Sequence, residues 1–286
     1  MPLSPGDLST LPSWPDMLTF LFFSIFVTGG LAAGFLTGLL GIGGGVVMVP
    51  ILYNSFVSWG WEPRAAISTA IATSLSVMIF SGAKTSWEYR REGLIDWGLL
   101  RWVVLGSIVG TTIGTHLMLG ADEHTIRLGF GILMCLLALL TLVPVSQLSP
   151  VIQEARDLRV TYLAVGILAG LLAAMFGVGG GAILVPALVL FARVSIHKAI
   201  ASSAAAIVFS ALLSSSDYVY EGWSSHSIAT GALGWIFLPA MLILGVSSLF
   251  SVPYGTKLAL RLAPQSLKYG LATLQTGIGI KIIFFG

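Results

Sequence analysis

The chain has 286 residues, of which 56% are hydrophobic and only 9% are charged. This composition lies outside the range of soluble domains and is typical of an integral membrane protein. The net charge of +2 arises from basic residues scattered singly along the chain, which argues against nucleic acid as a partner. The single cysteine, Cys135, excludes a disulfide framework and a cysteine metal site.

Ten apolar runs follow an N-terminal tail over residues 1–16. Because the tail contains no Lys or Arg, we expect no cleaved signal peptide. The predicted membrane segments of the first half are residues 17–40, 44–58, 65–83, 97–119 and 125–144. Those of the second half are residues 160–177, 181–192, 199–216, 229–252 and 267–285. The predicted domains are a first repeat at 17–145, a linker at 146–159 and a second repeat at 160–286.

A glycine-rich decapeptide occurs twice. Residues 41–50 read GIGGGVVMVP, and residues 177–186, 136 positions later, read GVGGGAILVP. A duplication of this kind in an apolar chain predicts a transporter built from two related halves around a central site.

The distribution of basic residues predicts the direction of each segment. If the chain reverses at each motif and the N-terminus lies outside, eleven Lys and Arg residues fall on the cytoplasmic side and three outside. If each motif only kinks one long helix, the division is seven to seven. Cytoplasmic loops collect Lys and Arg, so the reversal is favoured. Five segments per half is an odd number, and the sequence therefore predicts two inverted repeats in an all-α polytopic membrane protein, with a cytoplasmic linker.

The motifs also predict a binding site. Three consecutive glycines break a helix, and the next helix then begins with N–H groups that lack partners. Lipid cannot satisfy such groups, whereas a helix N-terminus binds anions. The segments after the motifs, at about 12 to 15 residues, are too short to span the bilayer and are expected to begin inside it. The predicted anion-binding residues are Gly43, Gly44, Gly45 and Val46 in the first copy and Gly179, Gly180, Gly181 and Ala182 in the second. The alternative is that these glycines serve only helix packing.

A helix rich in Ser and Thr follows each motif. Thr69 aligns with Ser202 at an offset of 133, and these two, with Thr73 and Ser203, are predicted to donate hydrogen bonds to the anion. The remaining hydroxyls are interpreted as helix contacts or bonds to the carbonyl of their own helix. Lys281 lies near a predicted segment end and is interpreted as an interfacial side chain.

The pattern G-x-x-x-G-x-x-G-x-G-G-G-x-x-x-V-P, which begins at Gly34 and returns in the second half with Ala174 in place of one glycine, resembles the sulfite exporter TauE/SafE family of membrane permeases. The similarity extends from about Leu18 to Ile283. It implies transport of sulfite, sulfonates or sulfoacetate across the bacterial inner membrane. The substitution of Ala174 predicts some difference between the two helix breaks.

The favoured function is therefore a secondary transporter for a small sulfur-containing anion in the lipid bilayer. An intramembrane enzyme is not favoured, because the four histidines are dispersed without ligand spacing, and no cofactor or metal is expected. An anion channel or a non-transporting scaffold is the alternative. The sequence leaves open which anion moves, in which direction, and whether a proton or sodium is the coupling ion.

Overall fold

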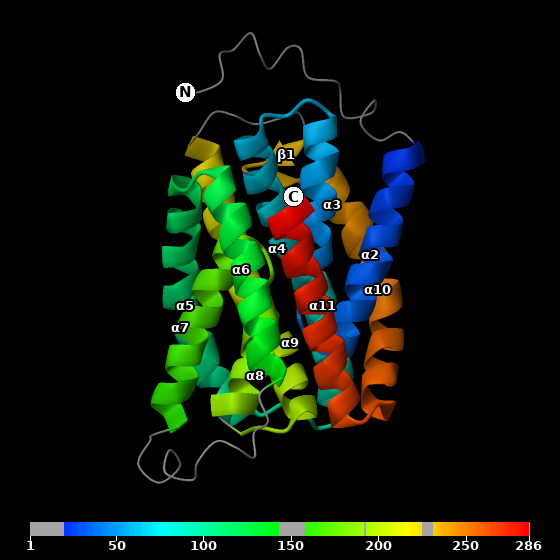
Figure 1. Ribbon diagram of the computed structural model, residues 1–286, viewed down its shortest axis with the longest axis vertical. Helices are drawn as coiled ribbons and strands as arrows, with labels where there is room; N and C mark the ends of the chain where they lie inside the picture. Colours follow the sequence, from blue (N-terminus) through cyan, green and yellow to red (C-terminus); the bar gives the residue numbers. More distant parts are fainter. Residues whose placement is uncertain (1–19, 143–157, 192, 225–230, 286) are drawn as a thin grey trace.

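The computed structural model describes residues 20–142, 158–191, 193–224 and 231–285. The tail at 1–16 and nearly all of the predicted linker at 146–159 lie outside these residues, so the domain boundaries stay a prediction. The described part of the chain forms ten α-helices and one short hairpin (Figure 1).

The first half contributes α2 (Phe20–Leu40), α3 (Gly45–Ser58), α4 (Pro63–Arg91), α5 (Trp97–Gly120) and α6 (Glu123–Leu142). The second half contributes α7 (Leu158–Phe176), α8 (Gly181–Phe191), α9 (Ile196–Ser224), α10 (Leu238–Arg261) and α11 (Pro264–Phe285). Strands β1 (Ala232–Leu233) and β2 (Ile236–Phe237) pair antiparallel just before α10.

Seven described helices are long and apolar enough to cross a membrane, and α3 and α8 are shorter apolar helices. The protein is therefore an all-α multi-pass membrane protein, as predicted. Figure 1 shows that α3 runs back alongside α2, and that α8 runs back toward the end at which α7 begins. The chain thus reverses direction at each glycine motif.

The two Ser- and Thr-rich helices are longer than the sequence predicted. Segments 65–83 and 199–216 correspond to α4 and α9, which continue through polar residues to Arg91 and Ser224. Polar residues extend a helix when they pair along it, and Lys84 forms an i,i+4 ion pair of 2.9 Å with Glu88. The prediction that residues 229–252 form one segment is wrong in its first part, because residues 232–237 form the hairpin.

Helices from opposite halves form the closest pairs. α2 packs along α10, α7 packs along α5, and α4 packs on α9 (Figure 1). Glycines allow this approach: a Cβ placed on Gly170 of α7 would lie 2.6 Å from the carbonyl oxygen of Ser107 on α5. Gly34 of α2 is likewise pressed against the carbonyl of Ser248 on α10. The first long helix of each half therefore packs on the fourth segment of the other half.

Candidate functional site

The two glycine motifs have the same backbone conformation. The φ angles of Gly41, Gly43 and Gly44 are 66°, 82° and 69°, and those of Gly177, Gly179 and Gly180 are 66°, 76° and 76°. Side chains with a Cβ rarely adopt this left-handed region, which explains why glycine occupies all six positions. The break is the same in both halves, so the expected difference caused by Ala174 does not extend to these backbone angles.

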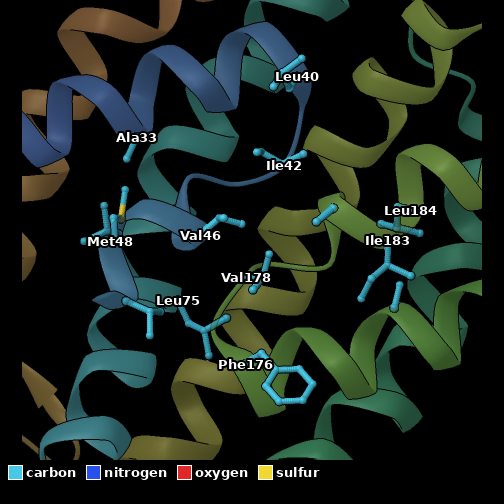
Figure 2. Close-up of a cluster of buried hydrophobic side chains, with 14 of the residues drawn as sticks. Ala33, Leu40, Ile42, Val46, Met48, Leu75, Phe176, Val178, Ile183 and Leu184 are labelled. Atoms are coloured by element: carbon cyan, nitrogen blue, oxygen red, sulfur yellow. The ribbon is translucent and has the colours of Figure 1, made fainter. Parts of the chain in front are cut away.

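The motifs cross at the centre of the molecule. The Cα of Gly45 abuts the carbonyl of Gly177, and the Cα of Gly181 abuts the carbonyl of Gly41. Figure 2 shows this crossing, with Ile42 on one connecting loop and Val178 on the other. The structure thus brings together the two sets of predicted site residues, from segments far apart in the sequence.

The glycines at the crossing are also required for packing. A Cβ on Gly43 would lie 2.9 Å from the carbonyl oxygen of Val178 and from Sδ of Met78, and a Cβ on Gly181 would lie 2.7 Å from Cδ1 of Ile207. An added methyl group would therefore meet protein atoms. The alternative that these glycines serve packing has direct support, and the argument for anion binding rests on their N–H groups.

At each break, a buried tyrosine donates a hydrogen bond to a carbonyl in the last turn of the preceding helix. The hydroxyl of Tyr89 donates to the Gly38 carbonyl at 2.8 Å, and the hydroxyl of Tyr218 donates to the Ala174 carbonyl at 2.9 Å.

The carbonyls of the first motif glycines are satisfied from the opposite half. The Ser203 hydroxyl donates to the Gly41 carbonyl at 3.0 Å, and the Ser74 hydroxyl donates to the Gly177 carbonyl at 3.1 Å. Four carbonyls around the two breaks thus accept hydrogen bonds from side chains, all of which are buried.

The N–H groups on the other side of each break have no such partners. Within the described part of the chain, no hydrogen bond uses the backbone N–H groups of residues 43–46 or 179–182. In α3, the first N–H groups that donate hydrogen bonds are those of Val47 and Met48, both to the Gly44 carbonyl. In α8, they are those of Ile183 and Leu184, both to the Gly180 carbonyl. All residues of both sets are buried. Two helix N-termini therefore carry unpaired donors in the interior, where an acceptor stabilises them.

The hydroxyl side chains occupy matching positions that differ from the predicted alignment. Thr73 accepts a hydrogen bond of 3.0 Å from the Phe237 N–H, and Ser202 accepts one of 3.3 Å from the Asp96 N–H. Phe237 and Asp96 are the N-cap residues of α10 and α5. Thr73 and Ser202, which are 129 positions apart, are therefore equivalent, and the prediction that pairs Thr69 with Ser202 at 133 is wrong.

The sequence contained a signal for this pairing. Residues 70–74 read AIATS and residues 199–203 read AIASS, again 129 positions apart. The same offset relates Ser74 to Ser203 and Tyr89 to Tyr218, so it would have identified Ser74 and both tyrosines, which the sequence analysis missed. Thr69 is buried, and within the described residues it has no side-chain hydrogen bond.

The fold and the crossing define the class of the protein. Helix breaks in the membrane interior that expose unpaired backbone groups to a central site are typical of secondary transporters. No group of three or more metal-ligating side chains occurs among the described residues.

Comparison with known proteins agrees with this class. The model of the sulfite exporter TauE/SafE family matches residues 26–282. A probable membrane transporter protein of Haemophilus influenzae is 29% identical over 93% of this chain and 99% of its own. The probable membrane transporter protein YunE of Bacillus subtilis is 28% identical over 77% of this chain and 83% of its own, and a probable membrane transporter protein of Xylella fastidiosa is 32% identical over 72% and 78%. No solved structure matches the chain. The chain belongs to the sulfite exporter TauE/SafE family and is a membrane transporter.

Proposed function

We propose that the protein is a secondary transporter that moves a small sulfur-containing anion, such as sulfite, a sulfonate or sulfoacetate, across the inner membrane. The anion binds where the motifs cross, at the N–H groups that begin α3 and α8. Thr73 and Ser202 add hydroxyl hydrogens, for which the described residues provide no acceptor. The N-terminus is outside in this proposal.

The observation that carries the proposal is the set of buried backbone N–H groups at the two breaks for which the described residues provide no acceptor. The freed carbonyls of Gly38, Gly41, Ala174 and Gly177 each receive a side-chain hydrogen bond. The freed N–H groups receive no acceptor from the described residues. Buried unpaired N–H groups are costly, so a binding partner that accepts hydrogen bonds stabilises them. An oxyanion fits this requirement, because its oxygens accept hydrogen bonds from N–H groups.

The relation between the halves supports alternating access. Ser74 and Ser203 each donate a hydrogen bond to the opposite half of the chain. Thr73 and Ser202 each accept one from the opposite half, so the links between the halves are reciprocal. Together with the two reversals of chain direction in Figure 1, this favours the predicted inverted repeats. In transporters of this design, one repeat moves relative to the other around a site near the midplane.

Counterflow in liposomes tests the proposal. Purified protein is reconstituted into vesicles loaded with unlabelled sulfite or sulfoacetate, and uptake of the radiolabelled anion is followed. A secondary transporter gives transient accumulation of label above equilibrium. An anion conductance without accumulation would instead identify a channel, and the absence of any anion flux would contradict the proposal.

A further inference from the structure

A cavity adjoins the start of α3. It has a volume of about 470 Å³ and is lined by residues of α3, α4, α6, α7 and α11. This volume lies within the range of about 300 to 1,000 Å³ that is usual for small-molecule sites. Its lining is mostly apolar and includes Ile71, Phe176 and Ile278.

The cavity joins a motif to a positively charged side chain. Val46, in the first turn of α3, lines it, as do Asn54 further along α3 and Lys281 on α11. Residues 46 and 54 of one helix are separated by roughly 12 Å along the axis, at 1.5 Å per residue. The cavity therefore extends along α3 from the buried N–H groups toward Asn54 and Lys281.

Lys281 is suited to attract an anion. Its side chain is exposed, and within the described part of the chain it forms no ion pair with a carboxylate. Lys281 of α11 lines the cavity together with Tyr53 and Asn54 of α3. An unpaired cation at the edge of a cavity attracts anions into it.

The corresponding region of the second half differs. The repeat relates Tyr53 and Asn54 to Val189 and Leu190, 136 positions later. The starts of α6 at Glu123 and α11 at Pro264 differ by 141 positions, and the same offset relates Leu140 to Lys281. Residues 181–190 of α8 are all buried. The positions equivalent to the polar residues Tyr53, Asn54 and Lys281 are therefore apolar, and those on α8 are buried.

We propose that this cavity is the vestibule through which the anion reaches the crossing of the motifs, with Lys281 as the residue that collects it. Asn54 donates a hydrogen bond near the mouth, and the apolar walls contact the organic part of a sulfonate. The identity of the ligand as an anion rests on the function proposed above, whereas the route and the role of Lys281 rest on the cavity.

Binding measurements separate the two proposals. Isothermal titration of sulfite and methanesulfonate into detergent-solubilised protein is compared for the unmodified protein, Lys281→Gln, Lys281→Arg and the matched control Lys257→Gln, which removes an exposed charge on α10. Loss of one partly screened cation should weaken binding about tenfold in Lys281→Gln. Lys281→Arg and Lys257→Gln should bind as the unmodified protein does. Raising the ionic strength should reduce the difference.

A steric variant tests the route independently of charge. Ile278→Trp fills the cavity, and Ile132→Trp adds the same bulk at an exposed position of α6. Counterflow should fall more than tenfold in Ile278→Trp and stay unchanged in Ile132→Trp. Two results would overturn the vestibule proposal alone, provided that the unmodified protein binds an anion. They are equal binding by Lys281→Gln and normal transport by Ile278→Trp. If the unmodified protein binds no anion, both proposals are overturned.

Discussion

The hydroxyl of Ser203 on α9 donates a hydrogen bond of 3.0 Å to the carbonyl oxygen of Gly41, in the motif of the other half. Ser74 on α4 donates in the same way to the carbonyl of Gly177. Each Ser- and Thr-rich helix thus holds the break of the opposite half in place. Because these bonds are buried and link the halves, their loss should affect stability as well as transport.

Replacement of Ser203 by alanine should lower stability. It removes the only donor to the Gly41 carbonyl among the described residues and leaves a buried acceptor unpaired, which costs about 1 to 3 kcal/mol. Ser216→Ala is the control, since that exposed hydroxyl bonds to Leu212 of its own helix. Reversible unfolding in mixed micelles measures both variants. Equal stability of Ser203→Ala and the unmodified protein would contradict the prediction.

Tyr89→Phe and Tyr218→Phe should each destabilise the protein to a similar extent. Each removes one buried hydroxyl that donates to a carbonyl at the end of α2 or α7, a loss of about 1 to 3 kcal/mol. Tyr254→Phe, at an exposed position of α10, should have no effect. The same unfolding assay compares the three. A large loss in only one of the two buried variants would show that the halves do not use these tyrosines equivalently.

Alanine at Gly44 should be more damaging than alanine at Gly180. Both positions have positive φ, but a Cβ at Gly44 would lie 2.8 Å from the Ala33 carbonyl oxygen, whereas at Gly180 the nearest atom is 3.2 Å away. Counterflow and melting temperature should fall in both variants, and further in Gly44→Ala. Gly277→Ala provides the control, because that helical glycine has open space around its Cα. Full activity of both motif variants would argue against the role of the breaks in transport.

A carboxylate beside the proposed site should prevent anion binding. Thr73→Asp and Ser202→Asp are compared with Thr73→Asn and Ser202→Asn, which have nearly the same shape without the charge. Two unit charges at ~5 Å repel by roughly 3 kcal/mol at an effective dielectric of ~20, a factor of more than a hundred in affinity. Sulfite affinity should therefore be lost only in the Asp variants, with folding verified by monodisperse elution. Unchanged affinity would place the anion elsewhere.

Positions 90 and 122 should be accessible from opposite sides of the membrane. Figure 1 places the end of α4 and the start of α6 at opposite ends of the bundle. Single cysteines at these positions, on a Cys135→Ser background, are labelled with a membrane-impermeant maleimide in intact cells. We expect label at 122 and not at 90, since the proposed N-terminus is outside. Labelling of both positions from one side would contradict the arrangement in which α4 ends and α6 begins on opposite sides of the membrane.

The sequence alone was sufficient for the class of protein and for the two breaks. An apolar chain needs hydrogen-bonded helices to cross a bilayer, and a glycine triplet within such a chain interrupts the helix wherever it occurs. Both consequences are local, so residues 41–50 and 177–186 predicted the breaks, and the basic residues of the loops predicted the reversals.

The hydroxyl pairs were recoverable from the sequence but were misaligned. The offset between the motifs is 136, whereas that between residues 70–74 and 199–203 is 129, because the connection after the first motif is seven residues longer. Ser202 was therefore paired with Thr69 in the sequence analysis, whereas the hydrogen bonds pair it with Thr73.

Only the tertiary structure decided which side chains form hydrogen bonds with the backbone at the breaks and which backbone groups there remain unpaired. The bond from Ser203 to Gly41 joins residues 162 positions apart, and the position of Lys281 beside α3 depends on how α11 packs. Such contacts result from close packing between helices of different halves, where glycines let backbones meet. A pattern within one helix contains no information about the helix that lies against it.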